Sequence, residues 1–77
     1  MYYVNVNRRV LMLGSRGPDV ELLQRILLSA GYNPGPIDGI FGPMTRQAVI
    51  QLQEDNNLVP DGIVGPATYA VIDLIYP

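Results

Sequence analysis

The 77-residue chain contains no cysteine, no histidine and no tryptophan. Without cysteine, neither a disulfide nor a thiolate metal site can form. Without histidine, the chain lacks the most common general base and the most common metal ligand. We also find no phosphate-binding loop, nucleophile elbow or EF-hand calcium loop. The sequence therefore predicts no catalytic residues, no metal and no cofactor, and indicates a binding module rather than an enzyme.

Positive charge is also scarce, since five arginines and no lysine stand against seven carboxylates, for a net charge of −2. Binding to a phosphate backbone needs clustered cations, and the only basic pair is Arg8-Arg9. No apolar run approaches the roughly 20 residues that span a bilayer. The first nine residues do not resemble a signal peptide. We therefore expect neither a nucleic acid nor a membrane as partner, and any export signal would lie elsewhere.

Glycine and proline mark the organisation of the chain. Residues 1–77 are expected to form one domain, because 48% of the residues are hydrophobic and the length allows a single core. Three Gly-Pro dipeptides mark helix starts, because proline suits the first helical position and glycine can precede it as N-cap. They predict helices over 18–30, 43–56 and 66–74. The chain before them is expected to be extended, with 1–9 as an N-terminal segment, and residues 76–77 to begin a linker. The predicted fold is all-α, with three short helices and long ordered loops.

Helical spacing predicts which face of each helix lies in the core. The expected inner faces are Val20, Leu23, Ile26, Leu27 and Ala30 in the first helix, Met44, Ala48, Val49 and Leu52 in the second, and Ala67, Val71 and Leu74 in the third. Ile50 lies instead among polar residues of the second helix. We expect the N-terminal residues Tyr2, Tyr3 and Val4 to cover it, and a contact to another domain is the alternative.

An internal repeat carries most of the information. The segment Asp38–Thr45 matches Asp61–Thr68 at six of eight positions, with the pattern Asp-Gly-x-x-Gly-Pro-x-Thr. Such a match predicts the duplication of one loop-helix unit. In each unit Asp-Gly favours a turn, the apolar pair that follows is expected to enter the core, and Gly-Pro opens the helix. The threonine is expected to bond back to the turn.

The full pattern resembles the type 1 family of peptidoglycan-binding domains. It runs through Leu13-Gly14, Gly17, Val20, Leu23-Gln24, Leu27, Gly31-Tyr32, Ile37-Asp38-Gly39, Phe41-Gly42-Pro43, Thr45, Ala48-Val49, Leu58, Asp61-Gly62, Val64-Gly65 and Thr68. The chain departs from that family at Tyr69, where Trp is frequent, at Leu52, where Phe is frequent, and at Ile50, where a polar residue is usual. The resemblance implies a three-helix module that binds peptidoglycan without catalysis and holds a wall hydrolase on its substrate. It also implies a location in the cell wall or outside the cell.

Two carboxylates, Asp38 and Asp61, match the minimum requirement of a glycosidase. The duplication explains both as turn residues, and we expect them to remain solvated. Gln24 and Gln53 each follow a core leucine, and we expect their amides to bond to loop backbone rather than to a ligand.

Five residues are candidates for a shallow ligand groove. Tyr32 and Tyr69 offer rings that stack on sugars, and Arg46 offers a partner for a peptide carboxylate. Asp38 and Asp61 would complete the groove if both loops share one face. For each of these side chains, a role in the core or on a solvated surface is the alternative.

The leading hypothesis is therefore non-catalytic binding of bacterial peptidoglycan by a monomer. The domain would target a tethered wall hydrolase or act by itself as a small wall-associated protein. The alternative is a protein–protein docking or structural module without wall binding of its own, and a minimal glycosidase at Asp38 and Asp61 ranks last. Affinity is expected to be weak, because a shallow groove buries little area.

Overall fold

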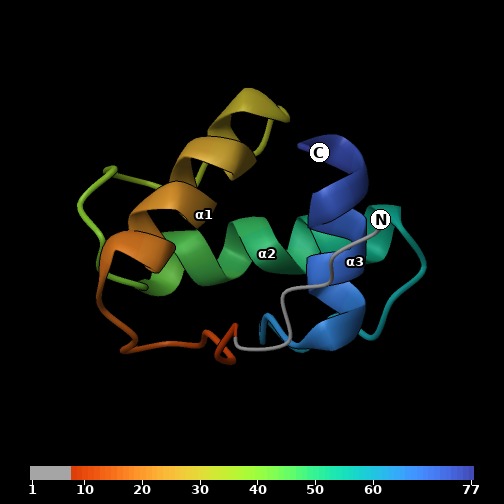
Figure 1. Ribbon diagram of the computed structural model, residues 1–77, viewed down its shortest axis with the longest axis horizontal. Helices are drawn as coiled ribbons and strands as arrows, with labels where there is room; N and C mark the ends of the chain where they lie inside the picture. Colours follow the sequence, from red (N-terminus) through yellow and green to blue (C-terminus); the bar gives the residue numbers. More distant parts are fainter. Residues whose placement is uncertain (1–7) are drawn as a thin grey trace, which may run out of the picture.

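The computed structural model describes residues 8–77. These contain three helices, α1 (Pro18–Ser29), α2 (Pro43–Asp55) and α3 (Pro66–Ile75), and no strand beyond two isolated bridges. Figure 1 shows α2 running across the molecule, with α1 towards one of its ends and α3 towards the other. The predicted all-α fold is confirmed. No helix within residues 8–77 combines the length and apolar character needed to cross a bilayer.

The Gly-Pro dipeptides begin the helices as predicted. Gly17, Gly42 and Gly65 are the N-caps, each followed by proline in the first turn. No side chain of the described residues 8–77 caps any of the three helices. Helix α1 ends before Gly31, whose φ of 95° is a left-handed conformation that glycine adopts without strain. Helix α2 ends at Asp55, with Asn56 as its C-cap, and Asn57 follows with φ 59°. Local turn residues therefore define the start of each helix and the ends of α1 and α2.

Within residues 8–77, the core contains eleven buried hydrophobic side chains. They are Leu11, Val20, Leu23, Ile26, Leu27, Phe41, Ala48, Val49, Leu52, Val64 and Ile72. In each repeat the second residue of the apolar pair enters the core, Phe41 at 1% and Val64 at 0% exposure, whereas Ile40 and Ile63 remain about 40% exposed. The expectation that both residues of each pair enter the core is therefore only half right.

Three residues predicted for the inner faces are exposed. Met44 is 50% exposed, Leu74 is 84% exposed, and Ala67 also lies at the surface. In α2 and α3 the first buried position belongs to a threonine, Thr45 or Thr68. Apolar spacing alone therefore favours Met44 and Ala67, each of which precedes a buried threonine and is turned from it by about 100° around the helix.

Residues 8–17, here called the strap, pair with both repeat loops. Leu11 and Val64 exchange two backbone hydrogen bonds of 3.1 and 2.8 Å. Further along, Phe41 N–H donates to the Ser15 carbonyl and Gly14 N–H to the Phe41 carbonyl, both at 2.9 Å. The strap thus connects the two repeat loops.

The predicted cover over Ile50 falls on Tyr2, Tyr3 and Val4, which lie outside the described residues. Ile50 itself is partly buried, and it lies beside Gly62 of the second repeat loop.

Candidate binding site

In the first repeat the loop is held by the side chain of Gln24, which is 1% exposed. Its Oε1 accepts hydrogen bonds from the backbone N–H groups of Asp38 (3.0 Å) and Gly39 (2.9 Å). Its Nε2 donates to the Ile40 carbonyl (2.9 Å) and lies 3.1 Å from Thr45 Oγ1 and 3.2 Å from Asp38 Oδ1. One glutamine from α1 therefore joins the turn to the start of α2.

The second repeat is built in the same way around Gln53, also 1% exposed. Its Oε1 accepts from Gly62 N–H (2.9 Å), and its Nε2 donates to the Ile63 carbonyl (3.0 Å). Its Nε2 also lies 3.0 Å from Thr68 Oγ1 and 3.1 Å from Asp61 Oδ1. The expected structural role of both glutamines is confirmed, and the buried amides have the partners that burial requires.

The two aspartates are hydrogen-bond acceptors within these turns. Asp38 Oδ1 accepts from Ile40 N–H, and Asp61 Oδ1 accepts from Ile63 N–H, both at 2.9 Å. These backbone bonds, together with those from the glutamine amides, hold the pKa of each carboxyl below its ordinary value. A glycosidase acid needs a raised pKa, so this environment is unsuited to that role.

The remaining candidates lie in different surroundings. The Tyr32 hydroxyl donates to Asp55 Oδ2 (2.7 Å), and this bond raises the pKa of the tyrosine. The Arg46 side chain lies against Gly62, and its charge helps to lower the pKa of Asp61. The structure therefore brings Arg46 and Asp61 close together. A ligand-binding role for either residue, or for Tyr32, stays a prediction.

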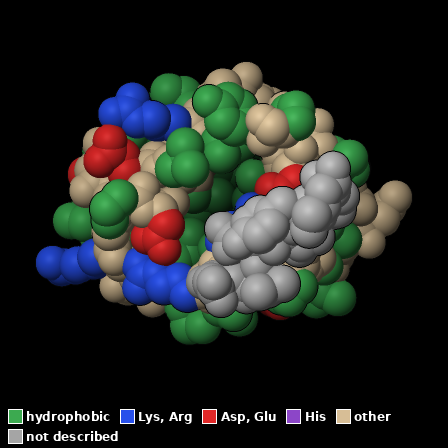
Figure 2. Space-filling model, viewed as in Figure 1, with side chains coloured by type: hydrophobic (Ala, Val, Ile, Leu, Met, Phe, Trp, Pro, Cys, Tyr) green, Lys and Arg blue, Asp and Glu red, His purple; other side chains and the backbone are tan. Residues whose placement is uncertain are grey.

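Tyr69 instead faces a hollow of about 100 Å³ between α1, α3 and the strap. Apolar side chains form most of its lining, namely those of Leu11, Leu22, Leu23, Ile26 and Ile72. Figure 2 shows this face, where hydrophobic side chains surround a depression with acidic and basic groups beside it. Of the five predicted ligand residues, Tyr69 is the one that lines this hollow.

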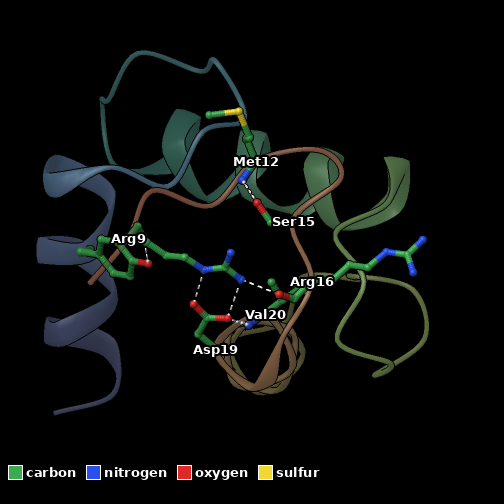
Figure 3. A network of polar contacts seen from close by, with 7 residues as sticks. Arg9, Met12, Ser15, Arg16, Asp19 and Val20 are labelled. Carbon is green, nitrogen blue, oxygen red and sulfur yellow. Dashed lines mark hydrogen bonds and ion pairs between the residues drawn. The ribbon is translucent and has the colours of Figure 1, made fainter. Parts of the chain in front are cut away.

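Two ion pairs at the rim tie the strap to the helices. Arg9 bonds to both carboxylate oxygens of Asp19 in α1 (2.7 and 3.0 Å) and to the Arg16 carbonyl (Figure 3). Arg8 bonds to both oxygens of Asp73 in α3, each at 2.8 Å. Hydrogen bonds from these arginines hold the pKa values of both aspartates below the ordinary value.

Tyr69 belongs to the same network. Its hydroxyl donates to the Arg9 carbonyl (2.6 Å), and the Arg8 guanidinium carbon lies 4.3 Å from its ring centroid, a cation–π contact. Burial raises the pKa of this tyrosine.

Sequence reasoning identified the Arg8-Arg9 pair but missed the hollow and its aspartates. The partners of Arg8 lie about 65 positions away in the chain, and no spacing rule connects them. Across residues 8–77, no cluster of three or more His, Cys, Asp or Glu side chains is arranged to hold a metal ion.

Known proteins share this architecture. The family model described as "Putative peptidoglycan binding domain" matches residues 16–72, which include both repeats and the strap's end. The zinc D-Ala-D-Ala carboxypeptidase of Streptomyces albus G is 48% identical over 61 residues, covering 73% of this chain and 23% of that protein. The spore cortex-lytic enzyme of Bacillus cereus is 37% identical over 62 residues, covering 80% of this chain and 24% of the enzyme.

Solved structures agree with the sequence relatives. The SleB N-terminal domain superposes with a TM-score of 0.82 and 35% identity, covering 86% of this chain and 90% of that domain. The Burkholderia AP3 phage endolysin gives a TM-score of 0.78 and 47% identity over 83% of this chain and 24% of the endolysin. The chain spans about a quarter of the length of the two enzymes from Streptomyces and Bacillus. Because the family model matches residues 16–72 and the relatives share this fold, the chain belongs to the family of peptidoglycan-binding domains.

Proposed function

We propose that this domain binds bacterial peptidoglycan as a non-catalytic monomeric module and keeps an associated wall hydrolase at its substrate. The observation that carries the proposal is the family match across residues 16–72, which spans both repeat loops, α1 and α2, and most of α3. Cell wall or extracellular surroundings follow from that substrate. The relatives support it, because their names describe enzymes of D-Ala-D-Ala bonds and of the spore cortex.

The geometry supports binding rather than catalysis by the described residues. Both aspartates of the repeats act as turn acceptors with lowered pKa values. The hollow beside Tyr69 offers an apolar surface with charged groups at its rim. A hollow of about 100 Å³ contacts only a small part of a polymer, so one module should bind weakly. Attachment to a second wall-binding or catalytic unit would raise the effective affinity.

Sedimentation with insoluble sacculi tests this function. The purified domain is incubated with sacculi, cellulose or chitin, and the pelleted fraction is measured at increasing protein concentration. We expect retention on sacculi alone. A folded domain that stays in the supernatant at high micromolar concentration would contradict wall binding and favour the protein-docking alternative.

A turbidity assay on the same sacculi separates binding from hydrolysis. We expect no clearing by the domain alone. Clearing that is lost in Asp38→Asn and Asp61→Asn variants would instead support the glycosidase alternative.

A further inference from the structure

We propose that the hollow between α1, α3 and the strap receives an alanine residue of the peptidoglycan stem peptide, rather than a sugar of the glycan strand. This inference rests on the proposed function and specifies which chemical part of the polymer the domain contacts. Three features support it: the size of the hollow, the charges beside it and the surroundings of Tyr69, whose ring lines it.

The size of the hollow favours a small aliphatic group. Its volume is about 100 Å³, and Leu22, Leu23, Ile26 and Ile72 supply much of its lining. An engineered apolar cavity of about 150 Å³ is enough to hold benzene. The hollow here is smaller and open on one side, so a methyl side chain with its adjoining backbone matches it better than a hexose ring bearing hydroxyl and acetamido groups. Hydroxyl groups placed against this lining would also lose hydrogen bonds to water.

The charges at the rim favour a peptide. Arg8 and Asp19 line the hollow, and their ion-pair partners Asp73 and Arg9 lie next to them, with side chains 32–53% exposed. A stem peptide carries free carboxylates, and in many walls also an amine, on residues next to its alanines. Groups of both signs at the rim complement those charges, and electrostatic complementarity mainly sets register and specificity. A neutral sugar would gain nothing comparable.

The aromatic ring in the lining is poorly placed for sugar stacking. Recognition of a pyranose by tyrosine uses a face of the ring as an apolar platform. At Tyr69 the Arg8 guanidinium lies over the ring, 4.3 Å from its centroid, and the hydroxyl is already bonded to the Arg9 carbonyl. Ring and arginine together form part of the wall of the hollow instead.

The test is an NMR titration of the ¹⁵N-labelled domain with two probes. One probe is a synthetic stem pentapeptide that ends in D-Ala-D-Ala. The other is glycan strands stripped of peptide by an amidase, with the freed lactyl carboxyl groups amidated so that the strands are uncharged. We expect the pentapeptide to shift amide signals of Leu22, Leu23, Ile26 and Ile72, and the stripped glycan to leave them unchanged. Shifts of these signals by stripped glycan and not by peptide would overturn the proposal.

A matched pair of variants locates the contact. Leu22 and Leu28 both lie on α1 and are 50% and 56% exposed, but Leu22 lines the hollow and Leu28 does not. Glutamine has a helix propensity similar to that of leucine and adds no charge. We expect Leu22→Gln to weaken pentapeptide binding on the order of fivefold, because it removes an apolar contact worth about one methylene or more. Leu28→Gln should bind as the wild type does, and equal affinities of the two variants would overturn the assignment.

The outcome for this site is distinct from the outcome for the function. If sacculi retain the domain but the pentapeptide produces no shifts in the hollow, peptidoglycan binding stands and the stem-peptide assignment is wrong. If sacculi do not retain the folded domain, the proposed function itself fails.

Discussion

Replacing Gln24 with leucine removes the side chain that holds the first repeat together. The variant keeps a side chain of similar size in a position that is 1% exposed, but it loses every hydrogen bond of the amide. The buried Gly39 N–H and the partly buried Asp38 N–H lose their acceptor, whereas the Thr45 hydroxyl keeps its hydrogen bond to the Pro34 carbonyl (2.8 Å). A buried polar group left without a partner costs about 1–3 kcal/mol.

Two such groups make the expected loss about 2–5 kcal/mol in the free energy of unfolding. At about 0.05–0.15 kcal/mol per residue, a domain of this length has only about 4–12 kcal/mol in total. With a slope of about 1 kcal/mol/M in urea, the unfolding midpoint should fall by about 2–5 M. The loss is therefore large enough to unfold a marginal domain.

Urea denaturation followed by far-UV circular dichroism provides the measurement, with Gln51→Leu as the matched control. Gln51 lies on the exposed face of α2, where a substitution usually changes stability by less than about 0.5 kcal/mol. Gln53→Leu should behave like Gln24→Leu, since it removes the equivalent bonds in the second repeat. If Gln24→Leu costs no more than Gln51→Leu, the central role assigned to the buried amide is refuted.

In the variant Gln24→Glu, the free energy of unfolding should gain a dependence on pH. At neutral pH a carboxylate there retains the acceptor for Asp38 and Gly39 but cannot donate to Ile40, and burial should raise its pKa. Because its folded pKa would lie above the unfolded value of about 4.3, the variant should regain stability relative to wild type as the pH falls through the raised folded pKa. A constant difference between variant and wild type from pH 8 to pH 4 would contradict this reasoning.

Two further predictions concern the ion pairs of the strap and the Asp38-Gly39 turn of the first repeat. The pKa values of Asp19 and Asp73 are lowered by their arginine bonds, so their contribution to stability should be complete above about pH 5 and should be lost as the pH falls through about 3.9 towards the folded values. An unfolding midpoint in urea that stays constant from pH 6 to pH 2.5 would contradict it. Gly39 has φ +74°, and an added Cβ would lie 3.1 Å from the Gly17 carbonyl oxygen, so Gly39→Ala should cost about 2 kcal/mol. Gly42→Ala, in open space at a negative φ, should cost less than about 1 kcal/mol by thermal unfolding, and equal costs would refute the explanation.

Local chemistry explains why much of the fold could be predicted from the sequence. Gly-Pro defines a helix start through backbone geometry alone, and an Asp-Gly turn needs only the aspartate and the next two N–H groups. Each of these features depends on only a few consecutive residues, so it can be predicted without knowledge of the core. The repetition of the pattern after 23 residues, from Asp38 to Asp61, supported each assignment with a second example.

The helix faces were harder to predict because polar side chains occupy buried positions. Thr45, Gln53 and Thr68 are all at most 3% exposed, yet an amphipathic pattern places such residues outside. Their burial is stable because each has hydrogen-bond partners outside its own helix. Thr45 bonds to Gln24 and Pro34, and Gln53 bonds to Thr68 and to the second repeat loop. A detectable signal existed in the Leu-Gln pairs that precede each Asp-Gly turn, although the spacing between glutamine and aspartate differs between the repeats.

The hollow could not be predicted, because its parts are distant in the chain. Arg8 meets Asp73 across 65 positions, and Tyr69 meets Arg9 across 60. Tyr69 is a candidate ligand residue in the sequence because its ring could stack on a sugar, and nothing in the sequence pattern indicates its contact with the strap.

The most direct test of the account is the retention of three proteins on peptidoglycan sacculi, namely the wild type, Leu22→Gln and Leu28→Gln. Circular dichroism first establishes that all three are folded, and binding isotherms then give their affinities. We predict that the wild type and Leu28→Gln bind equally and that Leu22→Gln binds on the order of fivefold more weakly. A folded wild type that shows no retention on sacculi would contradict the central claim.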